Sequence, residues 1–311
     1  MPKTNLRETI KETIRHHLKK NNGLVMGQCL TAVGWVGGTL PELYEKDGMI
    51  ELSMADVAGG GFAVGAALSG RKPIYVIRYQ GFNWFNAPII LNYACKSKEI
   101  WGIPCSMLIR SIGMEGSIGP VAGSSHHSLY YRMPGIKIVS PMSPNEFKKV
   151  YHDFINNDDV IYVSEHRKSY DNREELKDII YEKPDITLFA ISITRFEAIE
   201  TSKKLFKEGT KVNVINIFEI KPLKISKKAK QSLIDSKFGG IVLDDDYVNG
   251  IAKNIAHDLN LMTNKIVNVI GLKDKSAGFY PQVDNLPPTS NEIRSFIYKI
   301  IKRQKSQIKY K

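Results

Sequence analysis

The chain has 311 residues, and 44 Lys plus Arg against 32 Asp plus Glu give a formal net charge of +12. Its hydrophobic fraction of 42% excludes a disordered or fibrous chain, and its length suffices for about two domains. No apolar run reaches ~18 residues and the first twenty residues are polar, so we expect neither a membrane span nor a secretory signal. Three isolated cysteines (Cys29, Cys95 and Cys105) favour a reducing, cytoplasmic location.

The excess of positive charge lies in the first twenty residues, around residues 203–237 and after residue 299. A lysine-rich, solvated surface is the ordinary interpretation, and a docking face for an acidic partner or RNA is the alternative. The chain carries no helix-turn-helix, zinc-finger or aromatic RNA-binding motif, so we expect no nucleic-acid partner.

Short, almost continuously apolar runs alternate with helical segments, as expected for parallel strands that are covered on both faces. The predicted strands are Leu24–Met26, Met49–Glu51, Pro73–Ile77, Cys105–Ile109, Ile136–Val139, Val160–Ser164, Ile186–Ser192, Lys211–Asn216, Gly240–Leu243 and Ile266–Val269. This alternation predicts an α/β protein with two open α/β domains, residues 1–182 and 183–311, which meet in the charged stretch Tyr181–Asp185.

Helix signals accompany these strands. The N-terminal stretch predicts an amphipathic helix on which His16 and His17 face solvent. Ser143–Glu146 and Thr289–Glu292 each have the spacing of a capping box, the first with Pro at the first helical position. The Asn156–Asp159 turn between a helix and a strand is interpreted as a polar loop, with a monovalent-cation site as the alternative.

A triple glycine and the acid before it form the first candidate site. Gly59–Gly65 follows a strand and opens a small-residue helix, but Val64 stands where a dinucleotide fingerprint needs its third glycine. Asp56 precedes these glycines in an otherwise apolar or small-residue stretch. It is interpreted either as a helix N-cap or as an acid that shares a proton with a ligand nitrogen.

Two further segments carry candidate side chains. His126 and His127 lie in a Gly/Ser-rich loop, where histidines often carry chemistry; without a nearby third ligand we expect no metal site. Phe82, Trp84 and Phe85 follow a predicted strand. They are either core residues or, since ligands bind at strand ends in α/β sheets, a platform for a heterocycle.

Several segments match one known family in order and spacing. They are Gly34–Leu40, Asp56 with Gly61–Pro73, Asn92–Lys96, Arg110–Ser128, Pro134–Pro141, Glu219–Leu223 and the region of Asp244. In this order they resemble the beta subunit of thiamine-diphosphate-dependent 2-oxo acid dehydrogenases of the pyruvate dehydrogenase type. More distantly, they resemble the last two domains of transketolase.

The resemblance implies a pyrimidine-binding thiamine-diphosphate fold followed by a transketolase C-terminal-like domain. Asp56 stands where the family has a glutamate that shares a proton with the pyrimidine, by which the thiazolium carbon is deprotonated. Phe82 matches the ring that stacks on the pyrimidine, and Gln28 and Tyr79 are implied as further cofactor contacts. His126 or His127 would face the substrate.

A part of the complete enzyme is missing from this sequence. We find no Gly-Asp-Gly segment followed by Asn for a magnesium–diphosphate site, and Asp47-Gly48 follows a lysine. The resemblance therefore implies an alpha-type subunit that holds the diphosphate and magnesium, in a heterotetramer of two alpha and two beta chains. An acyltransferase partner is a further possibility.

The function implied by the resemblance is that of an oxidoreductase subunit that decarboxylates a 2-oxo acid and transfers or oxidises the resulting carbanion. One alternative is the C-terminal subunit of a split transketolase that transfers a two-carbon ketol unit. The other is a non-catalytic subunit that kept the fold. It is motivated by Asp56, whose side chain is shorter than glutamate by one methylene, about 1.5 Å, and by Gln28-Cys29, which replaces an acidic pair.

Overall fold

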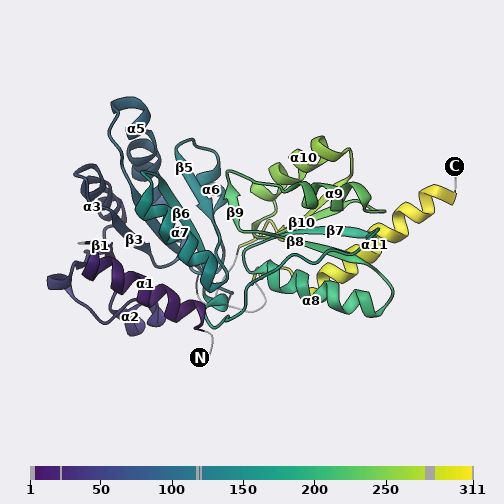
Figure 1. Cartoon of the computed structure of the whole chain (residues 1–311), viewed down its shortest axis with the longest axis horizontal. Helices are drawn as coiled ribbons and strands as arrows, with labels where there is room; N and C mark the ends of the chain where they lie inside the picture. Colours follow the sequence, from purple (N-terminus) through teal and green to yellow (C-terminus); the bar gives the residue numbers. More distant parts are fainter. Residues whose placement is uncertain (1–3, 22, 117–118, 120, 277–283, 310–311) are drawn as a thin grey trace. The chain divides into compact units, whose positions relative to one another are not determined.

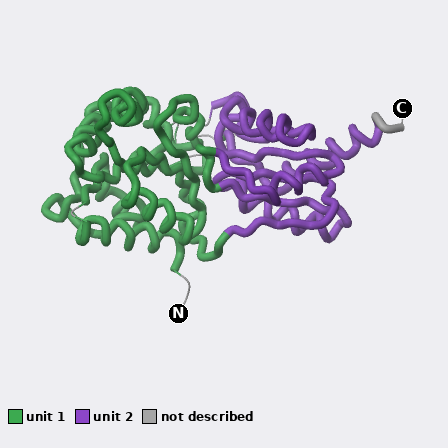
Figure 2. The backbone as a smooth tube through the Cα atoms, turned by 45° about the horizontal axis from the view of Figure 1, so that its top comes forward, with its two compact units in different colours: residues 1–175, 218–222, 277–284 green, residues 176–217, 223–276, 285–311 purple. Residues whose placement is uncertain are grey.

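The chain forms two compact units, which Figure 1 and Figure 2 show in a computed structural model that describes residues 4–21, 23–116, 119, 121–276 and 284–309. The first unit contains the residues up to 175 together with 218–222, and the second contains 176–217, 223–276 and the residues from 285 onward. Each unit contains one open, mainly parallel sheet, so the predicted α/β fold with two sheets is confirmed. The domain boundary between residues 182 and 183 stays a prediction.

The first unit is built on a seven-stranded sheet in the order β2-β1-β3-β4-β6-β5-β9. The strands are β1 (Leu24–Gly27), β2 (Met49–Glu51), β3 (Pro73–Ile77), β4 (Met107–Gly113), β5 (Ile136–Val139), β6 (Val160–His166) and β9 (Glu219–Lys221). All neighbours pair in parallel except β9, which pairs antiparallel with β5 and was not predicted. The carboxyl ends of β1, β3, β4 and β6 therefore meet at one edge of this sheet.

Helices cover both faces of the first sheet. On one face, α1 (Leu6–Lys20) packs against α7 (Pro144–Asn156), and apolar residues of both join the core of the sheet. On the other face, α3 (Asp56–Leu68) packs on β3 and on the segment α4 (Asn83–Ile89), π-helical η3 (Ile90–Ala94) and α5 (Cys95–Trp101). The short elements are α2 (Ala32–Gly38), η1 (Glu45–Asp47), η2 (Gln80–Phe82), α6 (Ser128–Tyr131) and η4 (Arg167–Ser169).

The second unit has a four-stranded parallel sheet in the order β11-β10-β7-β8. Its strands are β7 (Ile186–Ile191), β8 (Val212–Ile217), β10 (Gly240–Tyr247) and β11 (Val267–Leu272), and its helices are α8 (Thr194–Lys207), α9 (Lys227–Asp235), α10 (Ile251–Thr263) and α11 (Ser290–Lys309). Apolar residues of α8 and α11 pack on this sheet. None of the helices in the described ranges combines the length and hydrophobicity that crossing a membrane requires.

Two strands extend further than the apolar runs predicted, because they carry a compensated pair of charges. Arg110 of β4 and Glu165 of β6 are both fully buried, and Arg110 donates from Nε and Nη2 to the two carboxylate oxygens at 2.6 and 2.8 Å. Tyr170 donates to Glu165 at 2.8 Å, and Arg110 also donates to Thr39 at 3.1 Å. A buried charge is tolerated when it is paired and hydrogen-bonded in this way.

The two predicted capping boxes differ in outcome. Thr289 and Glu292 exchange hydrogen bonds at the start of α11, so that box is confirmed. Ser143 is the N-cap of α7, but its hydroxyl donates to Glu175 at 2.6 Å, and the same carboxylate accepts from the backbone N–H of Asn145 at 3.0 Å. The predicted box at Ser143 is therefore wrong, because a carboxylate 30 residues further along the chain contacts the helix terminus.

A lysine ammonium occupies the carbonyl end of α7. The Nζ of Lys72 donates to the carbonyl oxygens of Phe154, Ile155 and Asn157 at 3.3, 2.9 and 2.8 Å. Unpaired carbonyls at a helix C-terminus favour a cation. At the Asn156–Asp159 turn, this charge comes from a side chain of the protein itself.

We expect Lys72→Met to lower the free energy of unfolding by about 2 kcal/mol, because charge-assisted hydrogen bonds to these carbonyls are lost. Urea unfolding of the purified chain measures the effect. Lys148→Met, an exposed lysine of α7, is the matched control and should change stability by less than about 0.5 kcal/mol. Equal losses for the two variants would contradict the assigned role of Lys72.

His17 is buried, so its predicted solvent exposure is wrong, whereas its neighbour His16 is exposed. The Nε2 of His17 lies 2.9 Å from the carbonyl oxygen of Lys72, and its ring packs against Tyr151 and Phe154 of α7. Burial lowers the pKa of His17 to about 4, and burial likewise lowers the pKa of His166 to about 4. Both imidazoles are therefore neutral in the folded protein near pH 7.

These lowered pKa values make stability depend on pH in a defined direction. Since the unfolded chain binds protons at its histidines below about pH 6.5 while the folded protein does not until about pH 4, stability is lost as the pH falls through this window. His17→Gln is expected to reduce the loss of unfolding free energy between pH 7 and pH 5, measured in urea, and His16→Gln should leave it unchanged. If the unfolding free energy of His17→Gln fell between pH 7 and pH 5 by as much as that of the wild type, His17 would not be a source of the pH dependence.

Candidate active site

The candidate site starts at the N-terminus of α3. The helix begins at Asp56, so Asp56 is its first residue, and the N-cap is Ala55, whose side chain cannot cap. In the amide orientation that satisfies both partners, the side-chain oxygen of Gln28 accepts from the backbone N–H groups of Asp56 and Ala55 at 3.1 and 3.3 Å. Gln28, which directly follows β1, therefore caps α3 in place of the aspartate.

Asp56 is oriented by a chain of hydrogen bonds. Asn86 of α4 donates to Oδ1 of Asp56 at 3.1 Å and to the carbonyl oxygen of Phe82 at 3.0 Å. The hydroxyl of Tyr75 donates to Oδ1 of Asn86 at 2.7 Å. Burial, and then the nearby Asp56 carboxylate, raise the pKa of Tyr75, so its hydroxyl keeps the proton that it donates. In the described chain, Asn86 is the only side chain that hydrogen-bonds the Asp56 carboxylate, which leaves Oδ2 for a ligand.

The two buried glycines after Asp56 permit this geometry. A Cβ at Gly59 would lie 3.0 Å from the hydroxyl oxygen of Tyr75, and a Cβ at Gly60 would lie 3.0 Å from Oδ1 of Asn86. A larger residue at either position would therefore force Tyr75 or Asn86 to shift by a few tenths of an ångström. The glycines bring the backbone of α3, and with it the short side chain of Asp56, close to the hydrogen-bonding partners.

One small cavity brings together four residues that the sequence analysis singled out. Gln28, Asp56, Tyr79 and Phe82 all line a cavity of about 110 Å³. Its remaining lining residues are Cys29, Met54, Tyr75, Val76, Ile77 and Arg78. The ring centroids of Tyr79 and Phe82 lie 6.0 Å apart, and the two ring planes make an angle of 31°.

The two loop histidines lie apart from this lining. Neither His126 nor His127 lines the cavity. The backbone N–H of His126 donates to Gln80 at 2.6 Å, its Nε2 lies 2.8 Å from the hydroxyl of Ser124, and its ring meets Trp84 edge-on. Nδ1 of His127 lies 3.1 Å from the hydroxyl of Ser164. A catalytic role for either histidine therefore stays a prediction.

Sequence reasoning missed the amides that organise the site. Gln80 donates to Ser164 at 2.9 Å and accepts from Tyr162 and the histidine loop, and it is fully buried. Asn83 donates to Ser111 and Tyr162 at 3.0 and 2.8 Å. The sequence did offer one signal, because three amides stand at positions 80, 83 and 86, at helical spacing between aromatic residues. Amides that are buried in this way need hydrogen-bond partners inside the protein.

The lining suits one flat, polar heterocycle. The cavity volume of about 110 Å³ is below the roughly 300–1,000 Å³ that is common for small-molecule pockets, so the cavity suits a single ring better than a whole cofactor. The aromatic faces of Tyr79 and Phe82 can stack on such a ring, and Oδ2 of Asp56 can meet a ring nitrogen. These residues fit the pyrimidine half of thiamine diphosphate, and the other half would lie outside this cavity.

Family comparisons agree with this architecture. The family described as "Transketolase, pyrimidine binding domain" matches residues 2–172, and "Transketolase, C-terminal domain" matches residues 177–281. The first match alone spans more than half of the chain.

Several curated proteins are similar over most of the chain. The acetoin:2,6-dichlorophenolindophenol oxidoreductase beta subunit of Cupriavidus necator is 25% identical over 209 residues, which are 62% of this chain and 62% of that protein. The 2-oxoisovalerate dehydrogenase beta subunit of Bacillus subtilis is 24% identical, with 70% and 72% covered. The pyruvate dehydrogenase E1 beta subunit of Bacillus subtilis is 25% identical, with 81% and 83% covered.

Solved structures share the fold. A split-gene transketolase described as an inactive beta4 tetramer has a TM-score of 0.70 at 16% identity, with 96% of this chain and 99% of that chain covered. Transketolase from Campylobacter jejuni has a TM-score of 0.72 at 15% identity, and this chain spans 47% of its length. With its two matched domains in this order, the chain belongs to the family that joins a transketolase pyrimidine-binding domain to a transketolase C-terminal domain.

Proposed function

We propose that this chain is the beta-type subunit of a heteromeric thiamine-diphosphate-dependent enzyme that decarboxylates a 2-oxo acid and transfers or oxidises the product. The observation that carries this proposal is the cavity that Asp56, Tyr79 and Phe82 line together at the carboxyl edge of the sheet. The three curated relatives described above are all beta subunits, and two of them are named as 2-oxo acid dehydrogenases.

In this proposal each residue of the cavity has a defined task. When bound, thiamine diphosphate supplies a carbon nucleophile that adds to a carbonyl group and stabilises the resulting carbanion. Oδ2 of Asp56 shares a proton with a pyrimidine nitrogen, Asn86 holds Oδ1, and Phe82 stacks on the ring. Gln28 fixes the first turn of α3, so the carboxylate keeps its position.

An alpha-type partner that holds the diphosphate and magnesium is part of the proposal. The size of the cavity supports it, because most of the cofactor would lie outside. Exposed apolar side chains on α3, α4 and η3 support it too, since contiguous apolar surface marks protein interfaces. Among them, Val57, Phe62, Trp84, Phe85 and Tyr93 are 50–63% exposed. We propose a heterotetramer in the cytoplasm; an acyltransferase partner rests on the resemblance alone.

We expect Asp56→Asn to slow exchange of the thiazolium C2 proton by at least about 10²-fold, since an amide cannot share a proton as a carboxylic acid does. The asparagine keeps an oxygen for Asn86, so the fold is preserved. NMR of the chain assembled with its alpha-type partner, magnesium and thiamine diphosphate measures the exchange in deuterated water. Asp274→Asn, an exposed loop position, is the control and should exchange at the wild-type rate.

Two outcomes of that experiment would contradict the proposal. Undiminished exchange in Asp56→Asn would remove Asp56 from the catalytic machinery. Absence of exchange in the assembled wild type would favour the non-catalytic alternative. Turnover of sugar phosphates without turnover of 2-oxo acids would select ketol transfer instead.

The partner surface has its own test. We expect Phe62→Glu, which places a charge on a side chain of α3 that is 63% exposed, to weaken assembly with the alpha-type chain by at least about tenfold. Leu286→Glu, at a loop side chain that is 52% exposed in the second unit, is the control. Native mass spectrometry of the mixed chains measures the assembly, and unchanged assembly of Phe62→Glu would exclude α3 as the docking surface.

A further inference from the structure

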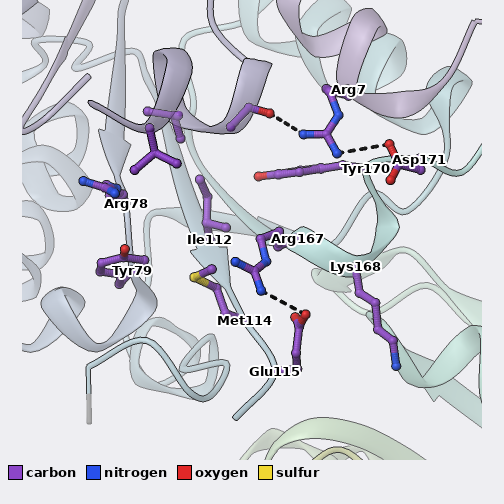
Figure 3. Close-up of a pocket in the computed structure, with 13 residues that line it drawn as sticks. Arg7, Arg78, Tyr79, Ile112, Met114, Glu115, Arg167, Lys168, Tyr170 and Asp171 are labelled. Atoms are coloured by element: carbon purple, nitrogen blue, oxygen red, sulfur yellow. Dashed lines mark hydrogen bonds and ion pairs between the residues drawn. The ribbon is translucent and has the colours of Figure 1, made fainter. Parts of the chain in front are cut away.

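A larger cavity lies at the carboxyl edge of the first sheet. It has a volume of about 600 Å³ and is lined by segments that follow β1, β3, β4 and β6 (Figure 3). Ligands of open α/β sheets bind at this edge, and pockets for small molecules commonly measure about 300–1,000 Å³. Its place in the fold and its size therefore suit a small-molecule ligand.

Most charges in this cavity are already paired. Arg7 donates to Asp171 at 3.0 Å, and Arg167 donates to Glu115 at 3.0 Å (Figure 3). Although burial acts to raise the pKa of Glu115, hydrogen bonds, including the one from Arg167, lower it overall, so this pair stays ionised. Lys168 extends away from Arg78 in Figure 3.

Arg78 and Lys168 are the two cations of this lining for which the described chain gives no ion pair, and of the two only Arg78 also lines the smaller cavity. It directly follows β3, it is half-buried, and its guanidinium lies 5.2 Å from the centre of the Tyr79 ring. No carboxylate of the described chain pairs with it. A guanidinium without a carboxylate partner can donate two parallel hydrogen bonds to the carboxylate of a ligand, in a bidentate pair.

The remaining lining is largely apolar. Val33, Val36, Ile112 and Met114 line the cavity, together with the ring of Tyr170. Residues 33–37 take positive φ angles between 52° and 62°, which valine and tryptophan rarely adopt. Backbone strain of this kind concentrates at functional sites. These side chains offer an apolar surface to one part of a ligand, beside the charged residues of the same lining.

This cavity adjoins the site of the proposed chemistry. Arg78 and Tyr79 line both the 600 Å³ cavity and the 110 Å³ cavity that contains Asp56. A ligand that reaches Arg78 from the larger cavity therefore lies next to the heterocycle that we place against Phe82 and Tyr79.

We infer that the larger cavity binds the 2-oxo acid substrate, that Arg78 pairs with its carboxylate, and that the substrate carries a bulky apolar side chain. This inference rests on the proposed function, and it names the class of substrate. Arg78 is a binding and specificity-determining residue, and Val33, Val36, Ile112 and Met114 select the apolar body of the acid.

The test measures direct binding of 4-methyl-2-oxopentanoate to the full-length chain. The binding is monitored by ligand-observed NMR titration. We expect saturable binding by the wild type and at least about tenfold weaker binding by Arg78→Met, since a charge-assisted, two-pronged contact is lost. Arg132→Met removes an equal charge from an exposed position outside the cavity and should bind as the wild type does. Urea unfolding of Arg78→Met shows whether a lost affinity is a lost fold.

A second measurement on the wild type does not depend on any variant. The uncharged methyl ester of the same acid is expected to bind at least about tenfold more weakly than the acid. Binding of the ester as tight as that of the acid, or Arg78→Met and Arg132→Met binding alike, would overturn the inference. Tighter binding of fructose 6-phosphate than of the acid would overturn it too.

The outcomes separate this inference from the proposed function. Thiazolium exchange in the assembled enzyme without binding of the acid at Arg78 would reject the pocket and keep the thiamine chemistry. Acid binding that depends on Arg78 but no thiazolium exchange would support the pocket and reject the thiamine chemistry.

Discussion

The close approach of α3 to β3 and α4 determines the geometry of the candidate site. A Cβ at Gly59 or Gly60 would lie only 3.0 Å from the polar groups of Tyr75 and Asn86, so glycine permits the close approach without a shift of these neighbours. Those two groups are the ones that orient Asp56 through hydrogen bonds. An aspartate reaches less far than a glutamate, and a helix that sits deeper on its sheet is a physical way to recover that reach. The small residues and the short acid are therefore best understood together.

The positions of the parallel strands followed from the sequence, whereas several of their ends and the antiparallel strand β9 did not. Buried parallel strands are apolar along their length, which is why the runs at β3 and β7 were recognisable. The strands β4 and β6 continue through Arg110 and Glu165, whose charges compensate each other across the two strands. No local pattern reveals such a partner 55 residues away. The carboxylate of Glu175 at the start of α7 was hidden for the same reason.

The candidate site, too, was predictable from the sequence only in part. Gln28, Asp56, Tyr79 and Phe82 follow three neighbouring strands, and the resemblance to a known family placed all four before the structure brought them into one cavity. The roles of Asn86 and Arg78 depend on side-chain contacts with residues of other elements or on the shape of a cavity, which spacing along the chain does not encode. The same holds for Lys72, whose partners lie 82 to 85 residues away.

The antiparallel strand β9 affects whether the amino-terminal half of the chain can be separated from the rest. Residues 218–222 lie between two segments of the second unit in the sequence, but they belong to the first unit and add a strand to its sheet beside β5. There the backbone N–H of Ser140 donates to the carbonyl oxygen of Phe218 at 2.9 Å, and Lys149 pairs with Glu219. A fragment that stopped at residue 175 would expose the backbone of β5, and an uncovered edge of this kind recruits strands from other molecules. The amino-terminal half is thus not a self-sufficient piece, and proteolysis or gene splitting at residue 175 would yield an aggregation-prone product.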